Sequence, residues 1–228
     1  MEFPVLGQAL SIEFANTVWF GGGRIHDALE GADVADRWLA AMAPRYATVL
    51  AGGPDRRLAP VDERLRTQLV ALRGTVRELF TALAARTAPG DEVLARLSAA
   101  SRESPRWLEA SLQPDGGVVT APRRSGGDPA RALIAALADD ALTLAGGPES
   151  RRLLSCPCPG CLGFFLQDDP RRRFCSPTCS TRWRVSRHYS RHRTGPPPAA
   201  KRRIKPDHGP GSRPADGQRG SPTAGNPL

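Results

Sequence analysis

Apolar residues recur every three or four positions in two long segments, and this spacing predicts two amphipathic helices. The clearer helix begins near Pro60 and ends before Pro89. Its apolar stripe consists of Val61, Leu65, Leu69, Leu72, Val76, Leu79, Phe80 and Leu83. The second helix opens at Asp128-Pro129, an N-cap followed by a proline at the first helical position, and ends at Gly146-Gly147. Both segments predict a domain built mainly from helices.

Shorter elements fill the remainder of residues 1–147. Asp33 is expected to cap a helix that ends before Pro44, and another helix is expected from Asp91. Residues 106–121 predict two short strands around a glycine-rich turn. The pattern of residues 10–18 fits a strand or a helix equally well, and Asn16-Thr17 is expected to cap a helix rather than to line a pocket.

All five cysteines lie within residues 156–179, in two groups that a 13-residue loop separates. Such spacing is typical of a zinc site, because each group forms a short chelating turn and four thiolates complete a tetrahedron. Cys175 and Cys179 form the second pair. In the first group, Cys158 and Cys161 have the common two-residue gap, whereas Cys156 and Cys161 have a gap of four, so spacing leaves Cys156 and Cys158 as alternatives.

The residues around the cysteines predict a treble-clef layout of knuckle, hairpin and helix. Residues 162–166 and 173–174 are expected to pair as a hairpin around a turn at residues 168–170, with its phenylalanines packed over the metal. A run without glycine or proline, Cys179 to Arg193, predicts a helix with one ligand in its first turn.

Charge is distributed unevenly along the chain, whose net charge is +9. Residues 1–150 carry a net −3, residues 151–193 carry +8, and residues 194–228 carry +4. A basic module joined to a mildly acidic one indicates a polyanionic partner, and nucleic acid is the partner this chain is expected to bind. The candidate contacts are Arg171, Arg172, Arg173, Arg182, Arg184, Arg187 and Arg191.

Within the predicted basic helix, Arg184, Arg187 and Arg191 are three or four residues apart and therefore share one face. An arginine fork suits phosphate oxygens and can also bind a guanine edge. Trp183 and Tyr189 are expected to pack on the hairpin rather than to stack on bases.

Several classes of protein are excluded by the sequence. Charge-free stretches are only about ten residues long, against the ~20 that a membrane span needs. No basic segment precedes an apolar run at the start, so a cytoplasmic protein with reduced cysteines is expected. No phosphate-binding loop and no catalytic triad spacing is present, so we do not expect an enzyme. The sequence indicates neither a small-molecule ligand nor an oligomeric state.

Two segments resemble known families. Residues 153–192 resemble the CGNR zinc finger of bacterial proteins, in which the first cysteine pair has the wider gap. This resemblance implies one structural Zn²⁺ held by Cys156, Cys161, Cys175 and Cys179. The segment Leu10–Thr17 resembles the opening of the ABATE domain, which usually precedes that finger. The name-giving tetrapeptide is altered here to Cys179-Ser-Thr-Arg182.

The resemblance implies a stress-related transcription regulator that binds DNA through its finger, with an N-terminal domain for sensing or interaction. An RNA-binding or protein-interaction finger without enzymatic activity is the alternative. The expected fold is α+β and mainly α. Its parts are a helical domain with a small β-hairpin (1–147), a treble-clef-like finger (151–193) and a disordered, basic, Pro/Gly-rich tail (194–228).

Overall fold

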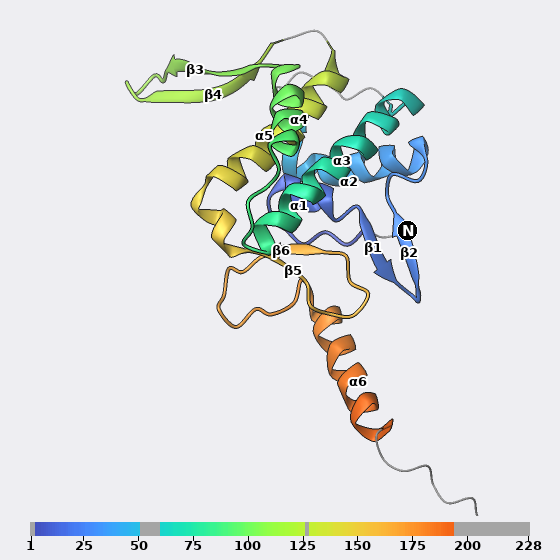
Figure 1. The fold of residues 1–228 in the computed structure, drawn as a ribbon. Coiled ribbons are helices and arrows are strands. Elements are labelled where there is room, and N and C mark those ends of the chain that lie inside the picture. The colour runs from blue at the N-terminus through green and yellow to red at the C-terminus, as the bar shows by residue number, and fades with distance from the viewer. Residues whose placement is uncertain (1–2, 51–59, 126–127, 194–228) are drawn as a thin grey trace, which may run out of the picture.

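The computed structural model describes residues 3–50, 60–125 and 128–193, and this part of the chain is α+β and mainly helical, as predicted (Figure 1). Its α-helices are α1 (Leu10–Ala15), α2 (Ala32–Leu50), α3 (Glu63–Ala84), α4 (Asp91–Arg102), α5 (Pro129–Gly146) and α6 (Pro177–Arg193). Its strands are β1 (Val18–Gly21), β2 (Arg24–Asp27), β3 (Arg106–Leu112), β4 (Val118–Arg124), β5 (Leu153–Ser155) and β6 (Phe164–Leu166). A 3-10 helix, η1 (Pro148–Arg152), leads into β5. The tail expected to be disordered, residues 194–228, lies outside the described residues.

Helix α1 lies at the centre of the hydrophobic core. All of its side chains are buried, and it packs against α3 and α5. Leu10, Ile12 and Phe14 are at most 1% exposed. Because a helix buried on every side shows no polar face, the hydrophobic pattern of this segment could not distinguish a helix from a strand.

The two long helices confirm the predictions from spacing. Helix α3 begins after Asp62, whose carboxylate accepts a hydrogen bond of 2.7 Å from the backbone N–H of Leu65. Helix α5 begins after Asp128, which accepts a bond of 2.9 Å from Ala130 N–H, and Pro129 is its first residue. Their apolar stripes meet in the core.

Helix α2 corrects one prediction, because it continues through Pro44 to Leu50 instead of ending before the proline. The backbone leaves helical geometry at Tyr46 (φ −128°, ψ 20°), so α2 is kinked just after Pro44. Tyr46 Oη donates a hydrogen bond to Gln8 O, so a tertiary contact holds the chain beyond the bend. Asp33 lies in the first turn of α2 rather than at its N-cap.

The three sheets are antiparallel hairpins of two strands each. The predicted hairpin of residues 106–121 is confirmed by β3 and β4, which project from the body (Figure 1). The hairpin expected between residues 162–166 and 173–174 is wrong: β6 pairs instead with β5, with Leu166 opposite Leu153. This pairing buries both leucines in the core beside α3, whereas residues 173–174 form no strand.

The strands β5 and β6 belong to the same core as the N-terminal helices. Leu153, Phe164 and Leu166 are buried with side chains of α1, α3 and α5, and the Phe80 ring of α3 packs edge-on against Phe164. Helix α6, in contrast, points away from the body (Figure 1). Among the described residues, no helix is long and apolar enough to span a membrane.

Candidate metal centre

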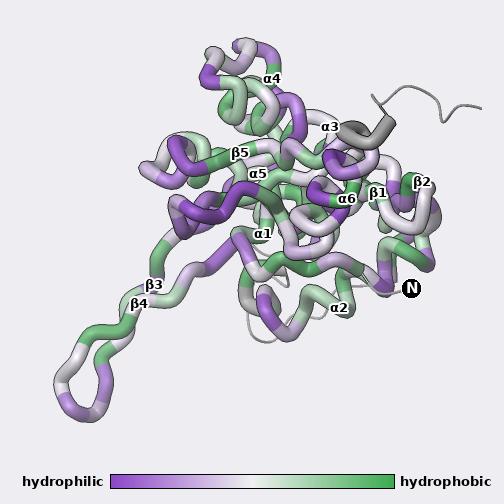
Figure 2. The backbone as a smooth tube through the Cα atoms, turned by 90° about the horizontal axis from the view of Figure 1, so that it is seen from below, coloured by the Kyte–Doolittle hydropathy of each residue, from purple (hydrophilic) through white to green (hydrophobic). Residues whose placement is uncertain are grey.

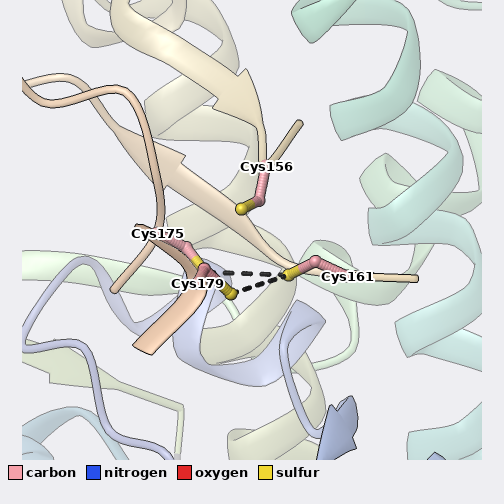
Figure 3. Close-up of side chains that lie close together, drawn as sticks. All are labelled: Cys156, Cys161, Cys175 and Cys179. Carbon is pink, nitrogen blue, oxygen red and sulfur yellow. Dashed lines mark hydrogen bonds between the residues drawn. The ribbon is translucent and has the colours of Figure 1, made fainter. Parts of the chain in front are cut away.

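Four cysteine sulfurs converge between the strand β6 and the start of α6 (Figure 3). The Sγ atoms of Cys156, Cys161, Cys175 and Cys179 all lie within 4.8 Å of one another. Cys175 lies 3.7 Å from Cys161 and 3.5 Å from Cys179, and Cys179 lies 3.7 Å from Cys161. Zn–S bonds of ~2.3 Å in a tetrahedron place the sulfurs about 3.8 Å apart. The four thiols therefore fit one structural Zn²⁺.

The first two ligands come from a tight turn that β5 and β6 hold in place. Cys156 directly follows β5, and its N–H donates to Gly163 O at 2.9 Å. Cys161 N–H donates to Cys158 O at 2.9 Å, and Gly160 between them has φ +73°, a conformation that favours glycine. Because the strand pair carries both ends of this turn, it fixes the separation of the two sulfurs.

The other two ligands lie around the N-terminus of α6. Cys175 precedes the helix, and Cys179 is in its first turn. Cys179 N–H donates to Ser176 Oγ at 3.2 Å, which satisfies one of the free donors at the helix end. The N-terminal end of a helix stabilises negative charge, so it favours the thiolate form that zinc needs.

Cys158 is buried but lies outside the group of four. Its Sγ accepts a hydrogen bond of 3.1 Å from Arg182 Nε. The same guanidinium donates to Pro159 O at 3.3 Å and stacks on the Phe20 ring of β1, 5.1 Å from its centroid. The structure thus places Cys156, and not Cys158, with the other ligands, and it gives Cys158 a role in holding Arg182.

Without a cation, each clustered thiol changes the pKa values of its neighbours. Hydrogen bonds from Cys161 and Cys175 lower the pKa of Cys156 to about 2. The contact with Cys156 in turn raises the pKa of Cys161 to about 12 and that of Cys175 above its ordinary range. One thiolate is therefore stabilised at the expense of its neighbours, and a divalent cation is what allows all four to ionise together.

Two buried carboxamides from the N-terminal part of the chain hold the edge of β6. Asn16 Nδ2 donates to Phe164 O and its Oδ1 accepts from Phe164 N–H, both at 2.8 Å. Gln8 Nε2 donates to Leu166 O at 3.2 Å, and its Oε1 accepts from Leu166 N–H at 2.8 Å. The two side chains act like a third strand, because they pair with the backbone groups that β5 leaves free.

Sequence reasoning missed this clamp of Gln8 and Asn16. Asn16 was expected to cap a helix, but its side chain contacts a strand 148 residues further along the chain. Thr17 does close the last turn of α1, since its Oγ1 donates to Phe14 O at 2.7 Å. The only signal was a pair of carboxamide residues on either side of a short segment in which apolar and polar residues alternate, and it does not identify their partner.

The candidate nucleic-acid residues fall into two groups. Arg172 and Arg182 are engaged in the finger: Arg172 donates to Cys175 O at 3.0 Å and lies over the Phe165 ring. The side chains of Arg171, Arg173, Arg184 and Arg187 are exposed. Arg191 lies in α6, but its side chain falls outside the described residues.

The aromatic residues of α6 also differ from each other. Trp183 packs against Phe174 at 5.5 Å between ring centroids, which agrees with the expected packing on the finger. The expectation for Tyr189 is wrong, because its side chain is 66% exposed. The helix leaves the body after its first two turns, so residue 189 has no hairpin surface to cover (Figure 1).

Comparison with known families agrees with this arrangement. The chain matches the ABATE family, described as "putative stress-induced transcription regulator", over residues 8–148, more than half of its length. It matches the CGNR zinc finger over residues 152–192, which include all four clustered cysteines. A search of curated proteins finds no match. The chain belongs to the ABATE family and carries a CGNR zinc finger.

Proposed function

We propose that this protein is a DNA-binding transcription regulator in which α6 of the zinc finger contacts DNA. The N-terminal part would sense a signal or bind a partner protein. The observation that carries the proposal is the position of α6, which extends into solvent with exposed Arg184 and Arg187 (Figure 1). A helix of this kind can enter the major groove of DNA, where arginine binds phosphates and guanine edges.

The surface around α6 supports the same partner. Arg171 and Arg173 are exposed in the loop before the helix, and Arg24 is exposed next to the turn of the β1–β2 hairpin. That hairpin lies beside the finger because its Phe20 packs under Arg182. Within the part of the chain that the structure describes, none of five exposed arginines forms an ion pair, so their charges are not neutralised and can attract a polyanion: Arg24, Arg171, Arg173, Arg184 and Arg187. The Arg187 guanidinium lies over the Trp183 ring, 4.7 Å from its centroid, and keeps its charge there.

The role we propose is not enzymatic. Catalytic zinc keeps one coordination position for water or substrate, whereas four thiolates fill the tetrahedron. A cytoplasmic, bacterial regulator accords with these thiols, because a reducing compartment keeps them available to the metal. The alternative is a finger that binds RNA or another protein through the same helix.

The test is the affinity of the zinc-loaded full chain for duplex DNA, measured by fluorescence anisotropy at several salt concentrations. About six phosphate contacts predict a slope of log K against log salt near −5. Arg184→Ala and Arg187→Ala are each expected to weaken binding and, where the residue contacts phosphate, to flatten the slope by about one unit. Arg102→Ala removes an exposed arginine from α4 and serves as the matched control, with no expected change.

The outcome separates the candidate functions. Tighter binding to RNA than to DNA would favour the RNA-binding alternative. Binding to neither, at any salt concentration, would contradict the proposal and favour a protein partner. Arg182→Ala adds an internal comparison, since Arg182 contacts Cys158 and Phe20, and its loss is expected to lower the stability of the finger.

A further inference from the structure

The β3–β4 hairpin forms an arm that projects from the helical body (Figures 1 and 2). All seven side chains of β3 and four of the seven in β4 are exposed. The base of the arm is nevertheless fixed: Arg124 pairs with Asp139 of α5 at 2.5 Å and donates to Ser104 O at 2.9 Å. Ser125 N–H donates to Pro105 O at 2.9 Å. These contacts anchor the base of the hairpin to the helical body.

One side of the arm is apolar beyond its first residue pair, Arg106 opposite Arg124. The register places Leu108 opposite Pro122, Ala110 opposite Thr120 and Leu112 opposite Val118. Residues two apart on a strand, and residues opposite each other on neighbouring strands, share one face of a sheet. These residues form the apolar face of the arm: Leu108, Ala110, Leu112, Val118, Thr120 and Pro122.

The apolar face has no partner within the described residues. Leu108, Leu112 and Val118 are 71%, 76% and 69% exposed. The opposite face is mixed: it carries the ion pair between Glu109 and Arg123 at 2.5 Å, and its apolar residues Trp107 and Val119 are less exposed, at 51% and 44%. Two strands alone are marginally stable in water, and an apolar face on them calls for a second layer.

We propose that the apolar face packs against the same face of a second copy of this chain, so that the protein is a dimer. Two arms related by a two-fold axis would form a small sandwich with the leucines and valines inside. The interface is isologous, since each arm offers the other the same residues. This proposal does not depend on nucleic-acid binding.

Charge and area favour a second copy as the occupant. The charged residues on this side of the arm, Arg106 and Arg124, lie at its base beside Asp139, so two copies can bring the outer part of the face together without leaving an unpaired charge. A specific interface needs at least about 1,000 Å² in total, so each copy would have to bury about 500 Å² of its arm. A charged peptide or a nucleic acid would find no complementary group on the outer part of this face, from Leu108 to Leu112.

The sequences of the two longer segments outside the described residues contain no strand that would match this face. Residues 194–228 contain only Ile204 and Leu228 as large apolar residues, among prolines, glycines and arginines. Residues 51–59 contain only Leu58. Neither segment has the alternating apolar residues that an opposing strand requires.

The test is sedimentation velocity of the zinc-loaded full chain from about 1 μM to about 100 μM, a range that includes micromolar dissociation constants. We expect a dimer whose dissociation constant is insensitive to salt, because the interface is uncharged. Leu112→Glu removes two leucines from each dimer and is expected to weaken it by about a hundredfold. Ser111→Glu, on the neighbouring residue but on the opposite face, is the matched control and should leave the dimer intact.

Three results would overturn the proposal. The unaltered chain could sediment as a monomer throughout the concentration range, which would leave a protein of different sequence as the occupant. The dimer could survive Leu112→Glu, or Ser111→Glu could weaken it equally. Because residues 111 and 112 are exposed, circular dichroism is expected to show both variants folded.

Discussion

The two halves of the zinc finger are attached to the protein in opposite ways. The strands β5 and β6 share the core of the N-terminal helices, and the carboxamides of Gln8 and Asn16 pair with the edge of β6. Helix α6 contacts the body through Arg182, which lies over Phe20, and its Trp183 packs on Phe174 within the finger. The helix then extends into solvent (Figure 1). One half is therefore a fixed platform, and the other is an exposed helix.

The metal centre joins these halves, since two ligands lie on each side of it. Cys156 and Cys161 belong to the platform, whereas Cys175 and Cys179 belong to the helix end. Most of the stability of a helix in a protein comes from packing against other elements, so α6 depends on its anchorage at the metal centre. Zinc therefore orients the basic helix, while contacts with the N-terminal helices stabilise the platform.

Removing the metal should give the largest effect, and the two halves of the finger should respond differently. Structural zinc contributes roughly 10–16 kcal/mol in small fingers, and here most of that loss should fall on α6. Chelation, or Cys175→Ser, is expected to speed amide hydrogen exchange in residues 175–189. Exchange in β6 should stay slow, because Asn16 and Gln8 still pair with it. Mass spectrometry of the full chain measures both segments at once.

Cys158→Ser is the control for the cysteine substitutions. A serine hydroxyl can still accept the hydrogen bond from Arg182, so a full equivalent of zinc should remain by metal analysis. Exchange in β6 as fast as in α6 after chelation would show that the strand pair also depends on the metal.

The sequence predicted the long helices and the ligands better than the platform. The stripe of α3 and the caps of α3 and α5 depend on residues a few positions apart, which a local pattern records. The spacing of the cysteines restricted the zinc ligands to two sets, and resemblance to a family chose Cys156 over Cys158. Geometry then placed Cys156 in the cluster.

The platform could not be predicted because its contacts join distant parts of the chain. Asn16 and Phe164 are 148 residues apart, and Gln8 and Leu166 are 158 apart. Strand β5 has only three residues, too few for a period to show, so β6 was paired with the wrong segment. The end of α2 was misjudged for a similar reason, since the contact of Tyr46 with Gln8 beyond Pro44 lies outside the helix itself.

Asn16→Ala tests the platform directly and should have an intermediate effect. The substitution leaves the buried N–H and C=O of Phe164 without partners, and each lost partner costs about 1–3 kcal/mol. We expect the free energy of unfolding in urea to fall by about 3 kcal/mol, with zinc still bound at neutral pH. Gln68→Ala removes an exposed carboxamide from α3 and is the control. An unchanged urea midpoint for Asn16→Ala would contradict the role of this clamp.

The smallest effect is expected at the ion pair that holds the β1–β2 hairpin beside the platform. Asp27 of β2 pairs with Arg73 of α3 at 2.5 Å and 2.8 Å, and Arg73 also donates to Thr17 Oγ1 at 3.1 Å. Burial raises the pKa of Asp27, but hydrogen bonds from Arg73 and from Leu29 N–H outweigh it. The pKa therefore lies below its ordinary value of 3.8.

A lowered pKa in the folded state fixes the sign of the pH dependence. The ionised carboxylate stabilises the fold above pH 3.8, and this stabilisation is lost as the pH falls through the lower folded pKa. Asp27→Asn should therefore lower the free energy of unfolding by about 1 kcal/mol at neutral pH, and its difference from the unaltered chain should shrink below pH 3.8. Both proteins lose zinc in acid to the same extent. The difference between their free energies of unfolding, measured from urea curves, therefore reports only the effect of Asp27. A difference that grew in acid would contradict the assignment. If amide hydrogen exchange in α6 is equally fast in the Asp27→Asn variant and in the unaltered chain, the ion pair stabilises the platform and not the exposed helix.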